Sequence, residues 1–241
     1  MALSLDAARD FATLHLTVPD GTAAIFDPMG ERVGVSHNFD DFFAINQPLP
    51  PPDEDHDTDR RHHFDPQGWI AERRRFARLA TISRKPVRMV EIAAGCRVES
   101  LFVSFEEQHA GDLFVLQTSR RVIRCHQSDE PDQDTDHRRV AVHATWGILD
   151  ALSMRQLQVL RLVTRGYSND RIGATIGRTK RAIEWHIRGL FSRLKVIDRV
   201  QLTIAGMRAG LDDIPEQAWK KMLALRFGID HERRPSDTLQ P

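Results

Sequence analysis

Several features that define other classes of protein are scarce in this sequence of 241 residues. It has two cysteines, Cys96 and Cys125, whose spacing suits neither a metal-binding motif nor a disulfide framework. No stretch approaches the roughly 20 consecutive apolar residues of a membrane-spanning helix. The N-terminus lacks the basic start and unbroken apolar run of a signal peptide. The sequence therefore predicts a soluble, cytoplasmic protein with no membrane partner.

Net charge is also absent, because 34 Lys and Arg balance 34 Asp and Glu. The balance is uneven along the chain. Between Ala151 and Leu211 there are twelve basic and three acidic residues, which leaves nine net positive charges there and nine net negative charges elsewhere. A basic part within an otherwise acidic chain indicates a polyanionic partner for that part.

Two acidic stretches, Asn46 to Gly68 and His126 to Arg139, contain almost no aliphatic side chains. Such a composition cannot bury enough apolar surface to offset the entropy of ordering, so we predict that both are mobile. We expect the domain order that follows from this division: an N-terminal domain over 10–124 with an insertion at 46–68, a linker over 125–147, a basic domain over 148–211 and an additional helix within 212–230.

The N-terminal domain has mixed signals. The expected elements are a strand at Ala23–Asp27, a tight turn, a strand at Arg32–Ser36, a short helix at Phe39–Ile45 with Asn38 as its cap, a helix around residues 69–80, and strands at 86–94, 97–107 and 111–121. Short turns separate the last three strands, which predicts an antiparallel meander.

With this order, the domain resembles a PAS domain, a sensor module in which a five-stranded sheet cups a helix-lined pocket. The resemblance is carried by "AAIFDPMGERVGVSHNFDDFFAIN" and by the closing strands "PVRMVEIAA", "RVESLFVSFEE" and "GDLFVLQTSRR". It implies a sensor role with a small-molecule ligand of unknown identity. No cofactor is evident in the sequence itself.

The basic domain is divided by helix caps and glycines. Ser153 and Ser168 are placed to cap two helices that end at Gly166 and Gly177, and Thr179 is placed to cap a third. The expected core positions are Leu157, Leu160 and Val163 in the first helix and Ile172, Ala174 and Ile176 in the second. A short helix, a turn with glycine and a longer basic helix form the helix-turn-helix plan, in which the last helix enters the major groove.

The third helix is "RTKRAIEWHIRGLFSRLKV", residues 178–196. Its apolar residues recur at spacings of three and four, which predicts one buried face made of Ile183, Ile187, Leu190, Phe191 and Leu194. The opposite face carries Lys180, Arg181, Arg188 and Arg193, with Glu184 and Trp185 among them. A face with this charge favours a nucleic-acid contact over a merely solvated surface.

The segment resembles the LuxR-type DNA-binding domain of bacterial transcription regulators. "LSMRQLQVLRLVTRGYSNDRIGATI" follows the family pattern "LTxREREVLxLxAxGxSNKEIAxxL", and "TKRAIEWHIRGLFSRLKVIDR" follows "SxxTVxxHxxxIxxKLxVxxR". Three positions depart from the pattern. Ala182 stands where Thr is usual, Arg193 replaces Lys, and Glu184 occupies a position that is often basic.

The resemblance implies roles for particular residues within the recognition helix, 179–194. It places Glu184, Trp185 and Arg188 against base edges, where Arg188 can pair with guanine and Glu184 can accept from cytosine. It leaves for the phosphates Thr179, Lys180, Arg181, Arg193 and Arg199. The family's histidine, here His186, looks structural. A fourth helix, 200–209, is the dimerisation helix of the family, and a two-fold dimer predicts a palindromic site.

No residues form a catalytic pair, so we expect no enzyme and no catalytic residues. His56, His62 and His63 lie in the acidic insertion, where solvated histidines are more usual than a metal site, so no metal is expected. The acidic linker residues are a candidate autoinhibitory segment for the basic face: Asp129, Glu130, Asp132, Asp134 and Asp136.

The sequence thus predicts an α+β chain: a PAS-like antiparallel sheet with helices, an all-α four-helix helix-turn-helix domain and an extra helix at 214–229. The expected function is sequence-specific regulation of transcription by a homodimer on double-stranded DNA, with the N-terminal domain as modulator and contributor to dimerisation. The alternative is an interaction module whose helix-turn-helix binds another regulator or RNA polymerase, with an apolar hot spot near Trp219 and Phe227. The role of the extra helix stays open between covering the dimer helix, packing on the N-terminal domain and binding a partner.

Overall fold

The computed structural model describes residues 21–45, 64–106, 112–122 and 138–228. Its elements are, in order, β1 Gly21–Phe26, β2 Arg32–Val35, α2 Phe39–Phe43, α3 Pro66–Ser83, β3 Val87–Ala93, β4 Cys96–Glu106, β5 Leu113–Arg121, β6 Arg138–Val140, the 3-10 helix η3 Gly147–Ala151, α4 Met154–Thr164, α5 Asn169–Ile176, α6 Lys180–Leu194, α7 Arg199–Arg208 and α8 Glu216–Phe227. The expected α+β class is confirmed. Among these helices, none has the length and apolarity that a membrane span requires.

The strands form one sheet in the order β2-β1-β5-β4-β3-β6. β3, β4 and β5 are the predicted antiparallel meander. β3 and β4 are joined by Ala94 and Gly95, whose φ angles of 51° and 71° give the two-residue loop the twist that antiparallel strands need. Ala93 and Cys96 face each other directly across this turn.

The sheet is mixed rather than wholly antiparallel, because β6 runs parallel to β3. The predicted linker over 125–147 is therefore wrong after residue 137. Beyond β6, the amide of Ala141 donates to the carbonyl of Val90 at 2.8 Å, and the amide of Thr145 donates to that of Ile92 at 3.1 Å. Strand pairing with β3 orders a segment whose own composition carries no strand signal. The rest of this acidic stretch, including the candidate autoinhibitory carboxylates, lies outside the described residues.

The predicted mobile insertion at 46–68 is also wrong at its end, because α3 begins at Pro66. Asp65 caps this helix, and its side chain accepts a hydrogen bond from the amide of Gln67 at 3.1 Å. Proline at the first helical position has the required φ and no amide to satisfy. Residues 46–63, with the three histidines considered for a metal, lie outside the described residues.

Asn38 precedes α2 as expected but makes no capping hydrogen bond, so its predicted role is wrong. Its side-chain oxygen accepts from the hydroxyls of Thr22 at 3.1 Å and Ser36 at 2.8 Å, and its nitrogen donates to the carbonyl of Gly21 at 3.0 Å. Asn38 thereby ties the start of α2 to β1, a non-local contact that helix-capping patterns do not reveal.

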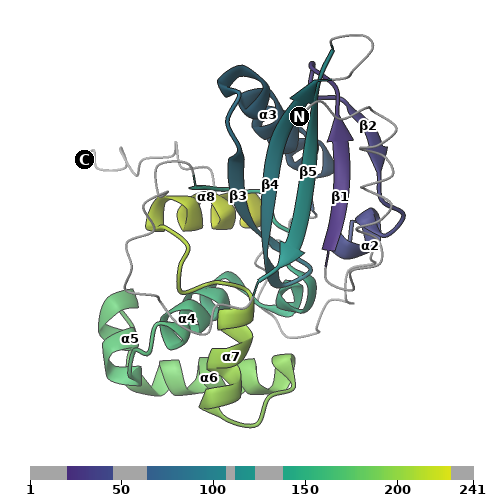
Figure 1. The fold of residues 1–241 in the computed structure, drawn as a ribbon. Helices are drawn as coiled ribbons and strands as arrows, with labels where there is room; N and C mark the ends of the chain where they lie inside the picture. The colour runs from purple at the N-terminus through teal and green to yellow at the C-terminus, as the bar shows by residue number, and fades with distance from the viewer. Residues whose placement is uncertain (1–20, 46–63, 107–111, 123–137, 229–241) are drawn as a thin grey trace, which may run out of the picture.

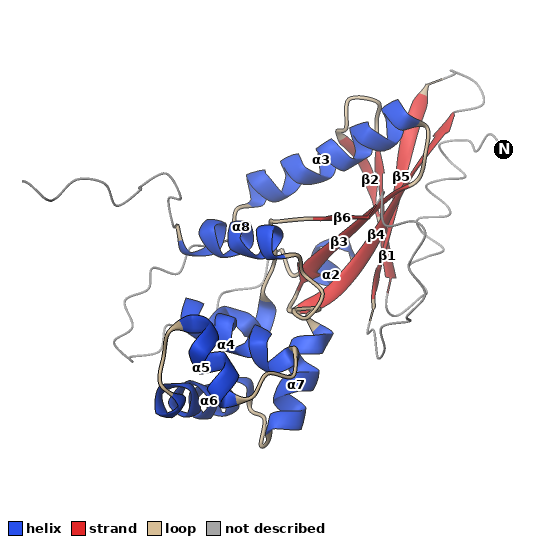
Figure 2. Cartoon of the chain, turned by 90° about the vertical axis from the view of Figure 1, so that its left-hand side faces the viewer, coloured by secondary structure: helices blue, strands red, loops and turns tan. Residues whose placement is uncertain are grey.

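Helices α2 and α3 cover one face of the sheet, as the two ribbon views show (Figures 1 and 2). The core between them is aromatic: Phe39 and Phe43 of α2 and Trp69 of α3 lie within 6.1 Å of one another by ring centroids. Phe76 of α3 stacks on Phe102 of β4 at 5.9 Å. This face also holds a buried ion pair between Arg73 of α3 and Glu91 of β3, at 2.6 Å.

A second core joins α4–α8 to the edge of the sheet. Ile92 of β3 belongs to it, together with Trp146 and the buried faces of the helices. α8 lies between the sheet and the helices below it (Figure 1), and its Trp219 meets Trp146 edge-on at 6.2 Å. None of the three roles left open for the extra helix describes this place in full, because α8 packs against the junction of the two parts.

Arg226 of α8 holds the segment that connects the sheet to α4. Its Nη2 donates to the carbonyls of Leu149, Asp150 and Leu152 at 2.9, 3.0 and 3.1 Å. The guanidinium also lies 4.7 Å from the ring centroid of Trp146, and the side chain is 4% exposed. One buried cation therefore donates to three carbonyls of the 3-10 turn and the residue after it.

Replacing Arg226 with Ala is expected to lower the free energy of unfolding by about 3 kcal/mol or more, because buried carbonyls lose a charged donor. Arg226→Lys, which keeps the charge but offers a single point donor, is expected to lose less. Urea unfolding of both variants measures this, and a loss below about 1 kcal/mol for Arg226→Ala would contradict the assigned role.

Glu72 of α3 holds the segment that follows β6. Its carboxylate accepts from the amides of Val142 and His143, both at 3.0 Å, and meets Nδ1 of His143 at 3.1 Å. Burial alone raises the pKa of Glu72, but the hydrogen bonds from His143 and Val142 outweigh it and lower the pKa below the ordinary 4.5. The ionised form of Glu72 is therefore the one that stabilises this contact.

A lowered pKa in the folded state means that Glu72 contributes stability above pH 4.5, its ordinary value, and loses it as the pH falls through the folded value. Glu72→Gln is therefore expected to be less stable than the parent near neutral pH. The difference in free energy of unfolding shrinks as the solution is acidified below pH 4.5. Denaturation curves across this range provide the check, and a difference that grows on acidification would have the wrong sign.

Candidate nucleic-acid interface

Each helix of the basic part begins at a side chain that caps it. Ser153 forms a capping box with Gln156, and the hydroxyls of Ser168 and Thr179 accept from amides three residues ahead at 3.3 Å. Asp198 does the same for α7 at 2.7 Å. The first three caps and their helices were expected from the sequence and are confirmed.

The turn between α5 and α6 depends on close backbone approach. Arg178 donates its amide to the carbonyl of Gly173 at 2.9 Å. A Cβ atom on Gly173 would lie 2.5 Å from the carbonyl oxygen of Arg178, so glycine is required here. The predicted core position Ala174 is exposed, and the prediction is wrong there because the buried residues of this helix are Ile172 and Gly173.

α6 has the two faces that its sequence predicts. Its buried residues are Ile183, Ile187, Leu190 and Leu194, and Phe191 is half-buried. Their packing against α4 and α5 fixes the rotation of α6 about its own axis. Because that face is committed to the core, the opposite face points to solvent.

The exposed face brings the expected base-contacting residues together. One shallow hollow on α6 is lined by Glu184, Trp185 and Arg188 with the cations Lys180 and Arg181. Trp185 is 67% exposed, which is unusual for an indole, and its ring lies 5.0 Å from that of its neighbour His186 by ring centroids. Tryptophan and arginine are both enriched at interfaces, so this hollow is a candidate contact surface.

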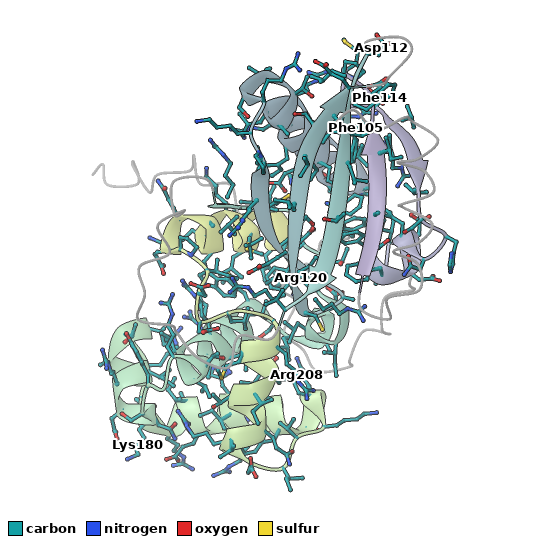
Figure 3. The ribbon with its side chains drawn as sticks, viewed as in Figure 1. Phe105, Asp112, Phe114, Arg120, Lys180 and Arg208 are labelled. Carbon is teal, nitrogen blue, oxygen red and sulfur yellow. The ribbon has the colours of Figure 1, made fainter. Side chains whose placement is uncertain are left out.

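Lys180 lies at the outer end of α6, on the side away from the sheet (Figure 3). Its Nζ donates to Asp170 of α5 at 3.0 Å, and this hydrogen bond raises the pKa of Lys180. Both side chains are exposed, so the pair connects the start of α6 to α5 only weakly. This contact between α5 and α6 was not predicted from the sequence. The only sequence feature that points to it is an acidic residue, Asp170, ten positions before Lys180.

Two of the residues expected at phosphates also make hydrogen bonds within the fold. Arg193 donates from Nη1 to the side-chain oxygen of Gln156 at 2.7 Å and to the carbonyl of Ala151 at 3.0 Å. Arg199 donates to the side-chain oxygen of Asn169 at 2.9 Å and to the carbonyl of Tyr167. Both guanidinium groups are half-buried and connect α6 and α7 to α4 and α5. The hydroxyl of Thr179 is occupied in capping α6.

An apolar strip lies along α7 and the turn before it. Ile197, Val200 and Ile204 follow one another at helical spacing and are 81%, 67% and 44% exposed. Leu202, on the opposite side of α7, is fully buried against α4 and its neighbours. The helix is therefore apolar on both sides, and one side has no cover within the described residues.

Comparison with known proteins places this geometry in a family. Residues 150–205 match the family model of bacterial regulatory proteins of the luxR family. The C-terminal part of the chain therefore contains a LuxR-type helix-turn-helix domain, and the family is one of transcription regulators, not of enzymes.

Two curated proteins share this segment. The HTH-type transcriptional regulator AlkS of Ectopseudomonas oleovorans is 43% identical over 60 residues, and AlkS of Pseudomonas putida is 40% identical over 62 residues. The match covers 25% and 26% of this chain but only 7% of either regulator. The similarity is thus confined to the DNA-binding domain.

Solved structures that align along most of the chain include VqmA of Vibrio cholerae. The VqmA dimer without target DNA is 14% identical, with 91% of this chain and 94% of that chain covered and a TM-score of 0.34. The VqmA–ligand–DNA complex is 14% identical, with 88% and 91% covered and a TM-score of 0.42. Both TM-scores are low.

The exposure of Trp185 gives a test of the two faces of α6. Trp185→Ala is expected to change the free energy of unfolding by less than about 0.5 kcal/mol, whereas Ile187→Ala is expected to cost about 2–5 kcal/mol. Urea unfolding of the two variants decides this. If Trp185→Ala costs as much as Ile187→Ala, the indole is part of the core and is not available to a partner.

Proposed function

We propose that this protein is a sequence-specific transcription regulator that binds promoter DNA as a dimer through α6. The observation that carries the proposal is the exposed cluster of Trp185, Arg188, Lys180 and Arg181 on the third helix of a LuxR-type helix-turn-helix, directly opposite its buried face. A helix presented in this way fits the major groove. Such a role would place the protein in the cytoplasm.

The side chains divide by the kind of contact that they can make. Arg188 offers two parallel donors to guanine, Glu184 accepts from cytosine, and Trp185 packs on a thymine methyl or on sugar. Lys180 and Arg181 supply affinity through phosphates. For Arg193 and Arg199 the internal hydrogen bonds favour a different role, in which they hold α6 and α7 at the angle that the groove requires.

The uncovered apolar strip of α7 supports dimerisation. Ile197, Val200 and Ile204 would be buried if two copies met along α7 about a two-fold axis, which is the usual symmetry of such pairs. The two recognition helices would then read the two halves of a palindromic site.

The N-terminal part would act as the sensor. Five antiparallel strands with α2 and α3 on one face support the PAS-like interpretation. Its signal has a direct route to the DNA-binding part, because Arg97 of β4 donates to Asp213, between α7 and α8, at 2.6 Å. Arg97 is 3% exposed and also packs against Gly210, so a shift of the sheet would be felt at the end of α7.

The structure contradicts one feature expected of the competing function, a protein-interaction module. It required an apolar hot spot near Trp219 and Phe227, but these residues are 3% and 6% exposed and belong to the core. A contact with RNA polymerase through another surface is compatible with promoter binding and adds to the proposed function rather than replacing it.

The test measures how the full-length chain binds fragments of DNA from its own genome at several salt concentrations. A double variant, Trp185→Ala with Arg188→Ala, is measured under the same conditions. The variant is expected to lose selective affinity by about 100-fold, since each base contact is worth about 1–3 kcal/mol. Affinity of the parent is expected to fall steeply with salt, because phosphate contacts release counterions.

Lys220→Ala is the matched control, because it removes one positive charge from an exposed site on α8. It should bind selectively like the parent. If the double variant binds as tightly and as selectively as this control, α6 does not read bases and the proposal fails.

A further inference from the structure

A cavity opens beside α3, between that helix, α2 and the β1–β2 hairpin. Its volume is about 230 Å³. An apolar cavity of roughly 150 Å³ accommodates benzene, so this one has room for a single ring with a substituent. Its walls are of two kinds, namely the aromatic side chains Phe26, Phe39 and Trp69 and the guanidinium groups Arg32, Arg73 and Arg74.

The arginines of this cavity hold buried donors without acceptors. Arg73 is 2% exposed and uses Nη2 for both oxygens of Glu91, at 2.7 and 2.6 Å, while its Nε has no hydrogen-bond partner in the described part of the chain. The Nε of Arg74 is likewise buried without a partner there. Buried N–H groups are almost always paired, so two unpaired groups from neighbouring residues at one cavity call for an acceptor that enters it.

The carboxylates around the cavity leave room for that acceptor. Glu31 pairs with Arg74, and Asp40 lies 3.8 Å from Arg32, but both pairs are 41–51% exposed. Exposed pairs of this kind are weak because water competes for them. An oxyanion inside the cavity would meet the same guanidinium groups with less water, where charge-assisted hydrogen bonds are stronger.

The aromatic walls determine what the acceptor is attached to. Phe39 and Trp69 meet edge to face at 6.1 Å, and the Cζ atom of Arg73 lies over the ring of Trp69, 3.2 Å from its centroid. Flat, apolar walls of this kind suit a planar ring. Gly30 lies at the hairpin side with a φ of 82°, and a Cβ there would come within 3.1 Å of the backbone of Arg74, so the hairpin can approach α3 closely enough to close that side.

We propose that this cavity binds a small planar carboxylic acid, with its oxygens accepting from Arg73 and Arg74 and its ring against Phe39 and Trp69. The idea that this acid is the signal sensed by the N-terminal part rests on the proposed function. Binding of the acid itself does not, because the cavity lies in the N-terminal part and its occupancy is measurable without DNA.

Benzoate is the probe, with benzamide as its neutral isostere, and calorimetric titration of the full-length protein without DNA is the measurement. Benzoate is expected to bind with a dissociation constant of about 1 mM or tighter, and benzamide at least about tenfold more weakly. Arg74→Gln is expected to weaken benzoate binding by about tenfold or more.

Two further variants separate the site from general charge and from misfolding. Arg75→Gln removes the same charge from the outer surface of α3, away from the cavity, and should bind benzoate like the parent. Ile70→Phe fills the cavity from a half-exposed position while keeping every arginine, and should abolish binding while the protein stays folded.

The proposal is overturned if benzoate does not bind, if benzamide binds equally well, or if Arg74→Gln and Ile70→Phe bind benzoate like the parent. DNA binding that depends on Trp185 and Arg188 would then still support the proposed function, so the two failures are distinguishable.

Discussion

The commitment of one face of α6 to the core is the constraint on which the rest of the structure depends. Ile183, Ile187 and Leu190 are buried, so the helix cannot rotate without exposing them, and the opposite face is held toward solvent. The caps at its start and the internal hydrogen bonds of Arg193 then fix its ends. A polar, aromatic surface is thereby held ready before any partner arrives, which lowers the entropy that binding must overcome.

The same core extends beyond the helix-turn-helix and joins the two parts of the chain. Ile92 of the sheet and Trp146 of the connecting segment lie in one cluster with α4–α8, and Arg226 fastens that segment by three hydrogen bonds. The ion pair across the junction between the buried Arg97 and the exposed Asp213 restricts how the parts can move. A ligand beside α3 would act on this junction through the sheet, because α3, β3 and β4 share one core.

Structural features could be predicted from the sequence where they depend on residues close together in the chain. The caps Ser153, Ser168 and Thr179 and the apolar spacing of α6 act within a few residues, and they predicted the helix-turn-helix correctly. β6 was missed because its pairing with β3 joins residues far apart in a stretch of acidic composition. The pair Arg73–Glu91 and the cavity beside it were missed for the same reason, since a helix and a strand meet only in the folded chain. The roles of Glu184, Trp185 and Arg188 on DNA remain predictions.

The proposed function requires that α6 reads base edges in the major groove, with Arg188 on guanine. Methylation interference at guanine N7 tests it most directly, because a methyl group there blocks a bidentate arginine without altering the phosphates. We expect that methylation of guanines placed symmetrically in the bound site prevents binding by the parent and no longer matters for Arg188→Ala. Binding by the parent that is indifferent to methylation of every guanine in the site would contradict it.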